Sequence, residues 1–274
     1  ISGRYHGQDG IYKIGNEKFN SYNLRSKISV KATETLTIDN NTSFSRNDYL
    51  QPIFTKGSDG VGTQLHQISM MGFPIVPAYN EDGTYTVSAA ASGFTSFNDR
   101  NSAQEESRAV FSTTIGATWE PFKDIFKIRG DFSYKNVNRE VDRYGATVKY
   151  SSAPEATTYY LAQPASYKQL FNYKSDYISA NVVATVPPEL GPDHNLNVVA
   201  GWNIENYDYH RLGILRQGLL SDLMPDFELM DGTETTLYDD GHSYGLVGFF
   251  GRANYTLLRR YIFELSARCD GSSK

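Results

Sequence analysis

The chain has 274 residues, of which 39% are hydrophobic and 21% charged, and its formal net charge is −5. This length is enough for one or two ordinary domains with a sizeable core. The negative balance argues against a nucleic-acid-binding protein, because such proteins usually carry a basic surplus. The single cysteine, Cys269, excludes an intrachain disulfide framework and a multi-cysteine zinc site.

The aromatic content is the unusual part of the composition. The chain has 20 Tyr and 15 Phe although its mean hydropathy is negative. It contains no run of eighteen apolar residues, so the sequence predicts no transmembrane helix. Because Ile1 is neither an initiator methionine nor the start of a signal peptide, we expect the chain to begin past any targeting segment.

Apolar and polar side chains alternate with a period of two over long segments. After Ile125, Phe126 and Ile128 share one face, whereas Lys127 and Arg129 share the other. A helix would scatter both sets, so the pattern predicts strands. About nine strands are predicted, in chain order Ile1–His6, Tyr22–Lys31, Leu36–Ser45, Val110–Glu120, Ile125–Lys135, Tyr177–Thr185, Leu196–Glu205, Tyr244–Leu257 and Tyr261–Arg268.

The connections between these strands alternate in length. The short ones lie near Ala32–Thr35, Pro121–Asp124, Pro187–Asp193 and Leu258–Arg259. The longer ones are Gln8–Phe19, Asn47–Ser107, Asn138–Ser175 and Asp208–Ser243. This order indicates an antiparallel up-and-down meander with tight turns at one end and large loops at the other, which is typical of outer-membrane barrels. The predicted fold is therefore an all-β transmembrane β-barrel segment with long extracellular loops.

The aromatic residues of one face support a membrane location. Outward rings of a barrel gather near both ends of the strands, around an aliphatic band. We expect Trp119, Phe126, Tyr255 and Tyr261 at the turn end, and Tyr22, Phe44, Phe111, Tyr134 and Trp202 at the loop end. The alternative is that these rings form the inner face of a two-sheet sandwich.

The opposite face of the predicted strands is strongly polar. A Lys or Arg facing lipid at the middle of a bilayer costs about 2–4 kcal/mol, so this face has to line a wet or protein-filled lumen. The candidate lumen-facing residues are Arg25, Lys27, Lys127, Arg129, Asp131, Arg252, Glu264 and Arg268.

Both ends of the sequence carry recognisable motifs. The C-terminal stretch reads Gly-Arg-Ala-Asn-Tyr at 251–255, then Arg-Tyr at 260–261 and Ser-Ala-Arg-Cys-Asp-Gly-Ser-Ser-Lys at 266–274. It resembles the SusC/RagA family of TonB-dependent outer-membrane transporters. The segments 2–11 and 19–25 are similar to an earlier strand pair of that family. The sequence departs from the family pattern at Cys269, where a charged or polar residue is usual, and it stops where another strand would follow.

The resemblance implies the architecture, location and partners of the whole protein. A barrel of this family has about 22 strands, so residues 1–274 would be a partial barrel domain without the plug domain. It implies a location in the bacterial outer membrane, a plug braced by the inward charges, energy from the TonB–ExbB–ExbD complex and a SusD-like surface lipoprotein over the loops. The expected function is import of nutrient oligomers, either oligosaccharides or peptides.

Aromatic residues in the predicted loops are candidate cargo contacts. Rings beside polar residues can stack on sugars or hold peptides while their hydroxyl groups form hydrogen bonds. The alternative is that they pack the loops against one another or against a partner. The candidates are Tyr79, Tyr85, Phe97, Tyr159, Tyr160, Tyr167 and Tyr209.

No motif indicates catalysis or a cofactor. The five histidines lie far apart, and neither a nucleophile elbow nor a phosphate loop is present. His210 could pair with Asp208, and the acidic segment Asp222–Asp240 could hold calcium or be a solvated surface. Glu81–Thr84 is expected to be the tip of a hairpin. Two other functions stay open, a small outer-membrane barrel or adhesin and a soluble carbohydrate-binding β-sandwich.

Overall fold

The structure is a computed structural model, and it describes residues 1–10, 16–52, 69–70, 75–92, 94–95, 102–122, 125–146, 148–161, 166–188, 190–221, 224–231 and 235–274. Strands dominate these ranges. The elements are β1 (Ser2–Asp9), β2 (Lys18–Lys31), β3 (Leu36–Pro52), β4 (Tyr85–Thr86), α2 (Val87–Ser92), β5 (Ala103–Phe122), β6 (Phe126–Gly145), β7 (Val148–Ser151), β8 (Thr158–Leu161), β9 (Tyr167–Val186), β10 (His194–Gln217), η1 (Phe227–Leu229), β11 (Thr235–Leu257) and β12 (Tyr261–Ser272).

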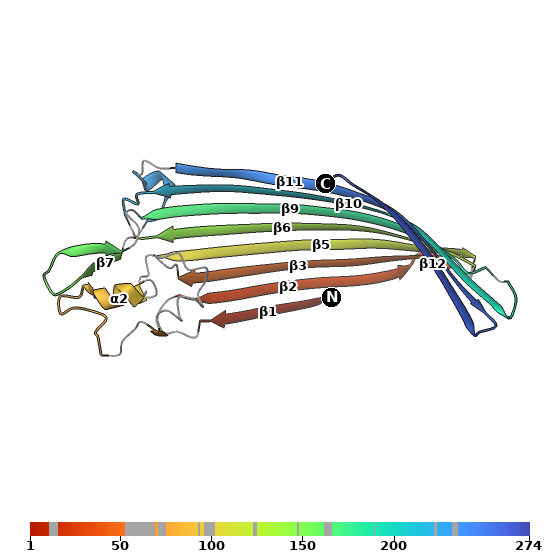
Figure 1. The fold of residues 1–274 in the computed structure, drawn as a ribbon, viewed down its shortest axis with the longest axis horizontal. Coiled ribbons are helices and arrows are strands. Elements are labelled where there is room, and N and C mark those ends of the chain that lie inside the picture. The colour runs from red at the N-terminus through yellow and green to blue at the C-terminus, as the bar shows by residue number, and fades with distance from the viewer. Residues whose placement is uncertain are drawn as a thin grey trace.

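Nine long strands form one antiparallel sheet, which is a single curved layer in Figure 1. Their order is β1-β2-β3-β5-β6-β9-β10-β11-β12, so each long strand pairs with the next one along the chain. The short strands β4, β7 and β8 lie within the long connections and form a second, three-stranded sheet. The predicted nine-stranded meander is confirmed, with short turns at one end and long connections at the other (Figure 1).

The strands run further towards the loop end than the alternation predicts. β9 begins at Tyr167 instead of Tyr177, and β10 continues to Gln217 instead of ending near Glu205. In the added part both faces carry polar side chains, so no alternation marks it, but ladder hydrogen bonds still satisfy the backbone. The three long connections are therefore shorter than predicted and cover 53–102, 146–166 and 218–234.

The register sorts the side chains of the large sheet onto two faces. Directly paired residues lie on the same side, and one such row is Ile38, Ala117, Gly130, Val182 and Trp202. We call this side the apolar face. It exposes large hydrophobic residues on every long strand, among them Tyr5, Leu24, Phe44, Phe111, Phe132, Val182, Ile204, Phe249 and Leu265.

All nine expected girdle rings lie on the apolar face. The position of Trp202 differs from the prediction. It pairs with Val182 and lies level with aliphatic residues in the middle of the neighbouring strands, not at the loop end. The alternation fixed its face correctly, but the strand length that sets its level along the sheet was underestimated.

No second layer of described residues covers the apolar face. The buried hydrophobic residues among them are only Ala89, Ala90, Ala103, Val141, Ala146 and Met230. The solvent-accessible surface is 17588 Å², whereas a compact monomer of 30.7 kDa has about 12,000 Å². A soluble β-sandwich would bury this face between two sheets. The described part of the chain does not have that arrangement, so the face is suited to contact with lipid.

The two edge strands of the sheet are open. Within the described ranges β1 pairs only with β2, and β12 pairs only with β11. A closed barrel needs an unbroken ring of strand pairs, so these nine strands form a wall and do not close into a small barrel. Unpaired backbone groups in hydrocarbon cost several kcal/mol each. In a bilayer each edge therefore requires a partner strand.

The structure at the loop end contains the expected hairpin tip. Tyr79 and Tyr85 form an antiparallel bridge, and Asn80 N–H donates to the Thr84 carbonyl at 2.8 Å. Gly83 has a φ of 84°, which suits glycine in the tight turn. The helices in the described ranges are short, and none of them could cross a bilayer.

Glycine at a cross-strand position lets an aromatic ring lie flat on the sheet. Gly201 pairs with Phe250, and a Cβ at Gly201 would overlap the ring. We expect Gly201→Val to lower the free energy of unfolding of the full-length protein by about 1–3 kcal/mol, because the ring is forced aside. At Gly251 a Cβ would meet only a backbone oxygen at 3.8 Å. Gly251→Val is the control, and equal denaturation midpoints for the two variants would contradict the expectation.

Candidate functional site

The eight candidate polar residues share one side of the sheet. The register places them opposite the apolar face, on a side that we call the polar face. One row across it is Thr118, Arg129, Val183, Gly201 and Phe250.

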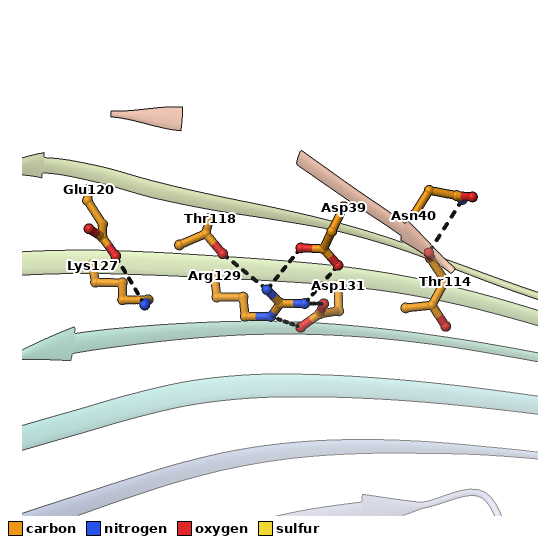
Figure 2. Close-up of polar contacts among 8 residues, drawn as sticks. All are labelled: Asp39, Asn40, Thr114, Thr118, Glu120, Lys127, Arg129 and Asp131. Atoms are coloured by element: carbon orange, nitrogen blue, oxygen red, sulfur yellow. Dashed lines mark hydrogen bonds and ion pairs between the residues drawn. The ribbon is translucent and has the colours of Figure 1, made fainter. Parts of the chain in front are cut away.

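Arg129 is the centre of an ionic network on the polar face (Figure 2). Its Nη1 and Nη2 donate to the two carboxylate oxygens of Asp39 at 3.1 and 3.2 Å. Its Nε donates to Asp131 Oδ2 at 3.0 Å, and its Nη1 donates to Thr118 Oγ1 at 3.1 Å. The network lies over Gly116, where a Cβ would approach all three charged groups within 2.8 Å. Because glycine has no Cβ, the guanidinium of Arg129 has room to lie between the two carboxylates.

Most other charges on the polar face are also paired. Lys127 Nζ lies 3.0 Å from Glu120 Oε1 (Figure 2). Arg252 Nη2 lies 2.8 Å from Glu264 Oε2, and Arg268 Nε lies 2.8 Å from Asp270 Oδ2. These pairs connect neighbouring strands or neighbouring positions of one strand, and they are half exposed. Each contributes about 0.2–1 kcal/mol.

Arg25 and Lys27 differ from the other six candidates. Arg25 Nε donates to the neutral side chain of Asn41 at 3.1 Å, and Lys27 has no ion pair or hydrogen bond with any described residue. These two side chains therefore keep an uncompensated charge.

The sequence did not identify Asp39 as a partner of Arg129, because pairing across strands depends on a register that alternation alone does not fix.

A polar pair also lies on the apolar face. Asn40 Nδ2 donates to Thr113 Oγ1 at 3.2 Å. It also donates to the carbonyl of Thr114 at 3.5 Å (Figure 2). Thr42 bonds both the Asn40 amide oxygen and the Thr113 hydroxyl. The side chains satisfy one another within β3 and β5, so they do not need water there.

Three of the candidate aromatic residues lie together in the small sheet. Tyr79 stacks on Tyr85 with ring centroids 5.1 Å apart, and Tyr150 lies 5.7 Å from Tyr159. Tyr85, Tyr150 and Tyr159 form one row across β4, β7 and β8, and Tyr79 extends this row through its isolated bridge to Tyr85. Tyr160 is on β8, and Phe97 lies outside the described residues. Within the row, Tyr79 and Tyr159 are the more exposed residues, at 42% and 49%.

Tyr167 and Tyr209 are not in loops, which corrects the prediction. Tyr167 begins β9, and Tyr209 lies within β10. The strands extend this far because their ladders continue beyond the region of apolar alternation.

Tyr209 belongs to a trough on the polar face, near the loop end. Two hollows of about 350 and 420 Å³ adjoin there and share Arg108, Val137, Ser175 and Tyr207. The trough crosses five adjacent strands from β5 to β11. Its complete lining is Glu106, Arg108, Lys135, Val137, Arg139, Tyr173, Lys174, Ser175, Tyr177, Tyr207, Tyr209 and Tyr244.

Of the seven candidate cargo contacts named from the sequence, Tyr209 lies in the trough. Tyr173 and Tyr177 on β9, and Tyr207 and Tyr209 on β10, have even spacings that place them on one side of their strands. That spacing is the signal that could have found the trough. The signal is weak because the predicted strands include only Tyr177, whereas Tyr173, Tyr207 and Tyr209 fall outside them.

The acidic segment 222–240 does not converge on one point. Asp226 caps η1, Asp239 pairs with His210 and Asp240 pairs with Arg211, whereas Asp222 and Glu234 lie outside the described residues. Within the described ranges no three His, Cys, Asp or Glu residues are placed to hold a metal. His210 pairs with Asp239, at 2.7 Å, and not with Asp208, because the register of β10 and β11 brings Asp239 close to that part of β10.

Asp82 connects the hairpin tip to the turn before β8. Its carboxylate accepts hydrogen bonds from Thr84 Oγ1 at 2.6 Å, Thr84 N at 3.0 Å and Glu155 N at 2.9 Å. These hydrogen bonds lower the pKa of the Asp82 carboxyl, and the bond from the Thr84 hydroxyl has the largest effect. The pKa of Asp82 is lower in the folded state than in the unfolded state, where it is about 4, so the ionised carboxylate stabilises the connection at pH values above the unfolded-state pKa. This stabilisation is lost as the pH falls through the folded-state pKa.

We therefore expect the backbone amide of Glu155 to become less protected against hydrogen exchange in acid, after correction for the intrinsic pH dependence of the exchange rate. Asp82→Asn should remove this pH dependence, whereas Glu81→Gln at the neighbouring exposed carboxylate should retain it. Hydrogen exchange of the full-length protein measures both. An unchanged acid response in Asp82→Asn would show that another group causes it.

No protein-family model matches the chain. The chain is 24% identical over 292 residues to TonB-dependent receptor P3 of Formosa agariphila, and 23% identical over 275 residues to TonB-dependent receptor P26 of the same bacterium. The matches cover 100% and 98% of the chain but 26% of each relative. The chain thus spans about a quarter of the length of the curated relatives it matches.

Solved structures of the RagAB peptide transporter have the same fold. One of them matches with a TM-score of 0.71 at 18% identity and covers 98% of this chain and 29% of that chain. The open-open state of the RagAB peptide importer matches with a TM-score of 0.70 at 17% identity, over 98% of this chain and 29% of that chain. The likeness in sequence and the likeness in fold agree with the motifs at both ends of the sequence. The chain therefore resembles a barrel segment of a SusC/RagA-like TonB-dependent receptor, a protein of the bacterial outer membrane.

Proposed function

We propose that residues 1–274 form part of the barrel domain of a TonB-dependent importer that takes up nutrient oligomers, either glycans or peptides. One observation carries the proposal: a long antiparallel wall has an exposed apolar face, a charged opposite face and all its long connections at one end. Lipid contact, a polar lumen and a surface-exposed cargo side account for these three features. The chain contributes wall and loops, and we assign it no catalytic step.

The polar face is proposed to line the lumen and to contact a plug domain. Arg25 and Lys27 are the strongest candidates for that contact, because the structure leaves their charges uncompensated. Lys127, Arg129, Asp131, Arg252, Glu264 and Arg268 are paired within the wall. We propose that these six mainly hold the wall and present a fixed pattern of charge to the plug.

The loop end is proposed to receive the cargo and a surface partner. RagAB is described as a peptide importer, and the two curated relatives are TonB-dependent receptors. By analogy we propose a SusD-like lipoprotein over the loops and energy from the TonB–ExbB–ExbD complex. The tyrosine row of the small sheet (Tyr79, Tyr85, Tyr150 and Tyr159), with Tyr160 and Phe97, is the proposed contact for lipoprotein or cargo.

Uptake by the native bacterium tests this function. Fluorescent oligosaccharides and peptides are supplied to cells with and without the full-length receptor, in the presence and absence of a protonophore. We expect one class of oligomer to enter only when both the receptor and the proton gradient are present. Unchanged uptake in the deletion strain, or recovery of the receptor from the medium without detergent, would overturn the proposal.

A further inference from the structure

The trough on the polar face carries an unbalanced positive charge. Arg139 donates to both carboxylate oxygens of Glu106, at 2.6 and 2.8 Å, so these two charges compensate each other. Arg108 and Lys135 are exposed and form no ion pair or hydrogen bond with any described residue. Both line the 420 Å³ hollow, over Val137 and Ser175. An anion entering this hollow would meet two cations whose charges no carboxylate of the wall satisfies.

The opposite side of the trough is a row of rings. Tyr207 lies 5.3 Å from Tyr244 and 5.8 Å from His242, and Tyr209 lies 5.0 Å from His242, measured between ring centroids. Mutual packing fixes these rings, so binding a flat ligand would restrict few additional rotamers. The phenol groups can donate and accept hydrogen bonds at the edge of the row.

The trough lies beyond the lipid-covered part of the wall. At its level the other face carries Asn136, Asn138, Asp176, Asn206 and Asp208. The loop-end rings Phe111 and Tyr134, with Ile178, lie at the lower margin of this level. Above them both faces are mainly polar, so this part of the sheet stands in water on the loop side. A ligand arriving from outside the cell would reach the trough before the ionic network around Arg129.

We infer that the trough binds a carboxylate-bearing oligosaccharide. A sugar carboxylate lies between Arg108 and Lys135, and neighbouring sugar rings lie against Tyr207 and Tyr244. The trough crosses five strands, which corresponds to about 19 Å at the usual strand spacing and accommodates several sugar units. This inference rests on the proposed import function and specifies the chemistry of the cargo.

The backbone of the trough favours a glycan over a peptide. Peptides commonly bind to sheets by adding a strand to a free edge. The trough is formed by β5, β6, β9, β10 and β11. The first four of these strands are paired on both sides there, and the outer edge of β11 before Gly245 is the one edge of the trough that no described strand pairs. Ring faces, hydroxyl groups and two cations remain available, and these groups suit an acidic sugar chain. Charge-assisted contacts to Arg and Lys would also make the binding sensitive to salt.

Calorimetry on the full-length receptor in lipid nanodiscs tests the inference. The probes are trigalacturonate, a trimer of mannuronate, the methyl esters of both, and the tripeptide triglutamate. We expect at least one acidic sugar to bind about tenfold or more tightly than its neutral ester. The double variant Arg108→Gln/Lys135→Gln should remove this difference, and Lys31→Gln, a cation of the same face near the turn end, should preserve it.

The outcomes separate this inference from the proposed function. Equal binding of acids and esters, or an unchanged acid preference in the double variant, would overturn the assignment of the trough. Binding of triglutamate without binding of either acidic sugar would also overturn it and point to peptides. In these cases, receptor-dependent uptake of another oligomer would leave the import function standing, whereas loss of all receptor-dependent uptake would remove both.

Discussion

Replacing Val182 by arginine should strongly impair assembly of the receptor in the membrane. Val182 lies on the apolar face about midway between the loop-end ring Tyr134, which pairs with Ile178, and the turn end of β9 at Val186. It is paired with Gly130 and Trp202, and its side chain is 42% exposed. If lipid covers this face, a guanidinium there costs about 2–4 kcal/mol. The midpoint of unfolding from lipid vesicles, measured on the full-length receptor by heat-modifiable gel mobility, should fall accordingly.

Asn181 provides the matched control on the opposite face. It is adjacent in sequence and pairs with Asp131 and Asn203. Asn181→Arg places the same charge beside a carboxylate, so we expect a change of less than about 1 kcal/mol. A tolerated Val182→Arg together with a damaging Asn181→Arg would reverse the assignment of the two faces.

Removing the guanidinium of Arg129 should be the most damaging truncation on the polar face. The change leaves Asp39 and Asp131 close together, with side chains only 27% and 21% exposed. A fully buried pair broken in this way loses about 3–5 kcal/mol; partial hydration reduces the expected loss for Arg129→Ala to about 1–3 kcal/mol. Equilibrium unfolding of the full-length receptor measures it, and Lys127→Ala, in an exposed pair on the same face, should lose less than about 1 kcal/mol.

The second half of this experiment tests the cause of the loss. If repulsion between the two freed carboxylates causes it, Asp39→Asn should restore part of the stability in the Arg129→Ala background. Alone, Asp39→Asn should be mildly destabilising, because Arg129 then keeps only Asp131. A double-mutant cycle gives the coupling energy directly. Additive effects of the two substitutions would show that the network in Figure 2 does not act as a unit.

Alternation predicted the fold wherever the two faces meet different surroundings. In β6, Phe126 and Ile128 oppose Lys127 and Arg129, and this contrast gave both the strand and the side to which each residue belongs. Beyond Tyr134 both faces are polar, so hydrophobicity no longer distinguishes a strand from a loop. The ends of β9 and β10 were therefore missed, although their backbone ladders continue without interruption.

The sequence predicted on which face of the sheet each candidate residue lies, but not which residues are its partners. All eight charged candidates lie on the polar face, because facing depends only on parity along a strand. Pairings such as Arg129 with Asp39 depend on the register between strands distant in sequence, and nothing in the local pattern fixes that register. The trough likewise becomes visible only when Arg108, Lys135 and Tyr207 are brought together from three strands.

The most direct test of the central claim is a scan of β9 in the full-length receptor. Single nitroxide labels are placed at positions 178 to 185 after the native free thiol has been removed by Cys269→Ser. In lipid vesicles we predict that labels at 178, 180, 182 and 184 collide with oxygen dissolved in the bilayer, whereas labels at 179, 181, 183 and 185 do not. Collision of the even-numbered labels with a water-soluble nickel reagent, or no alternation at all, would contradict a lipid-facing barrel wall.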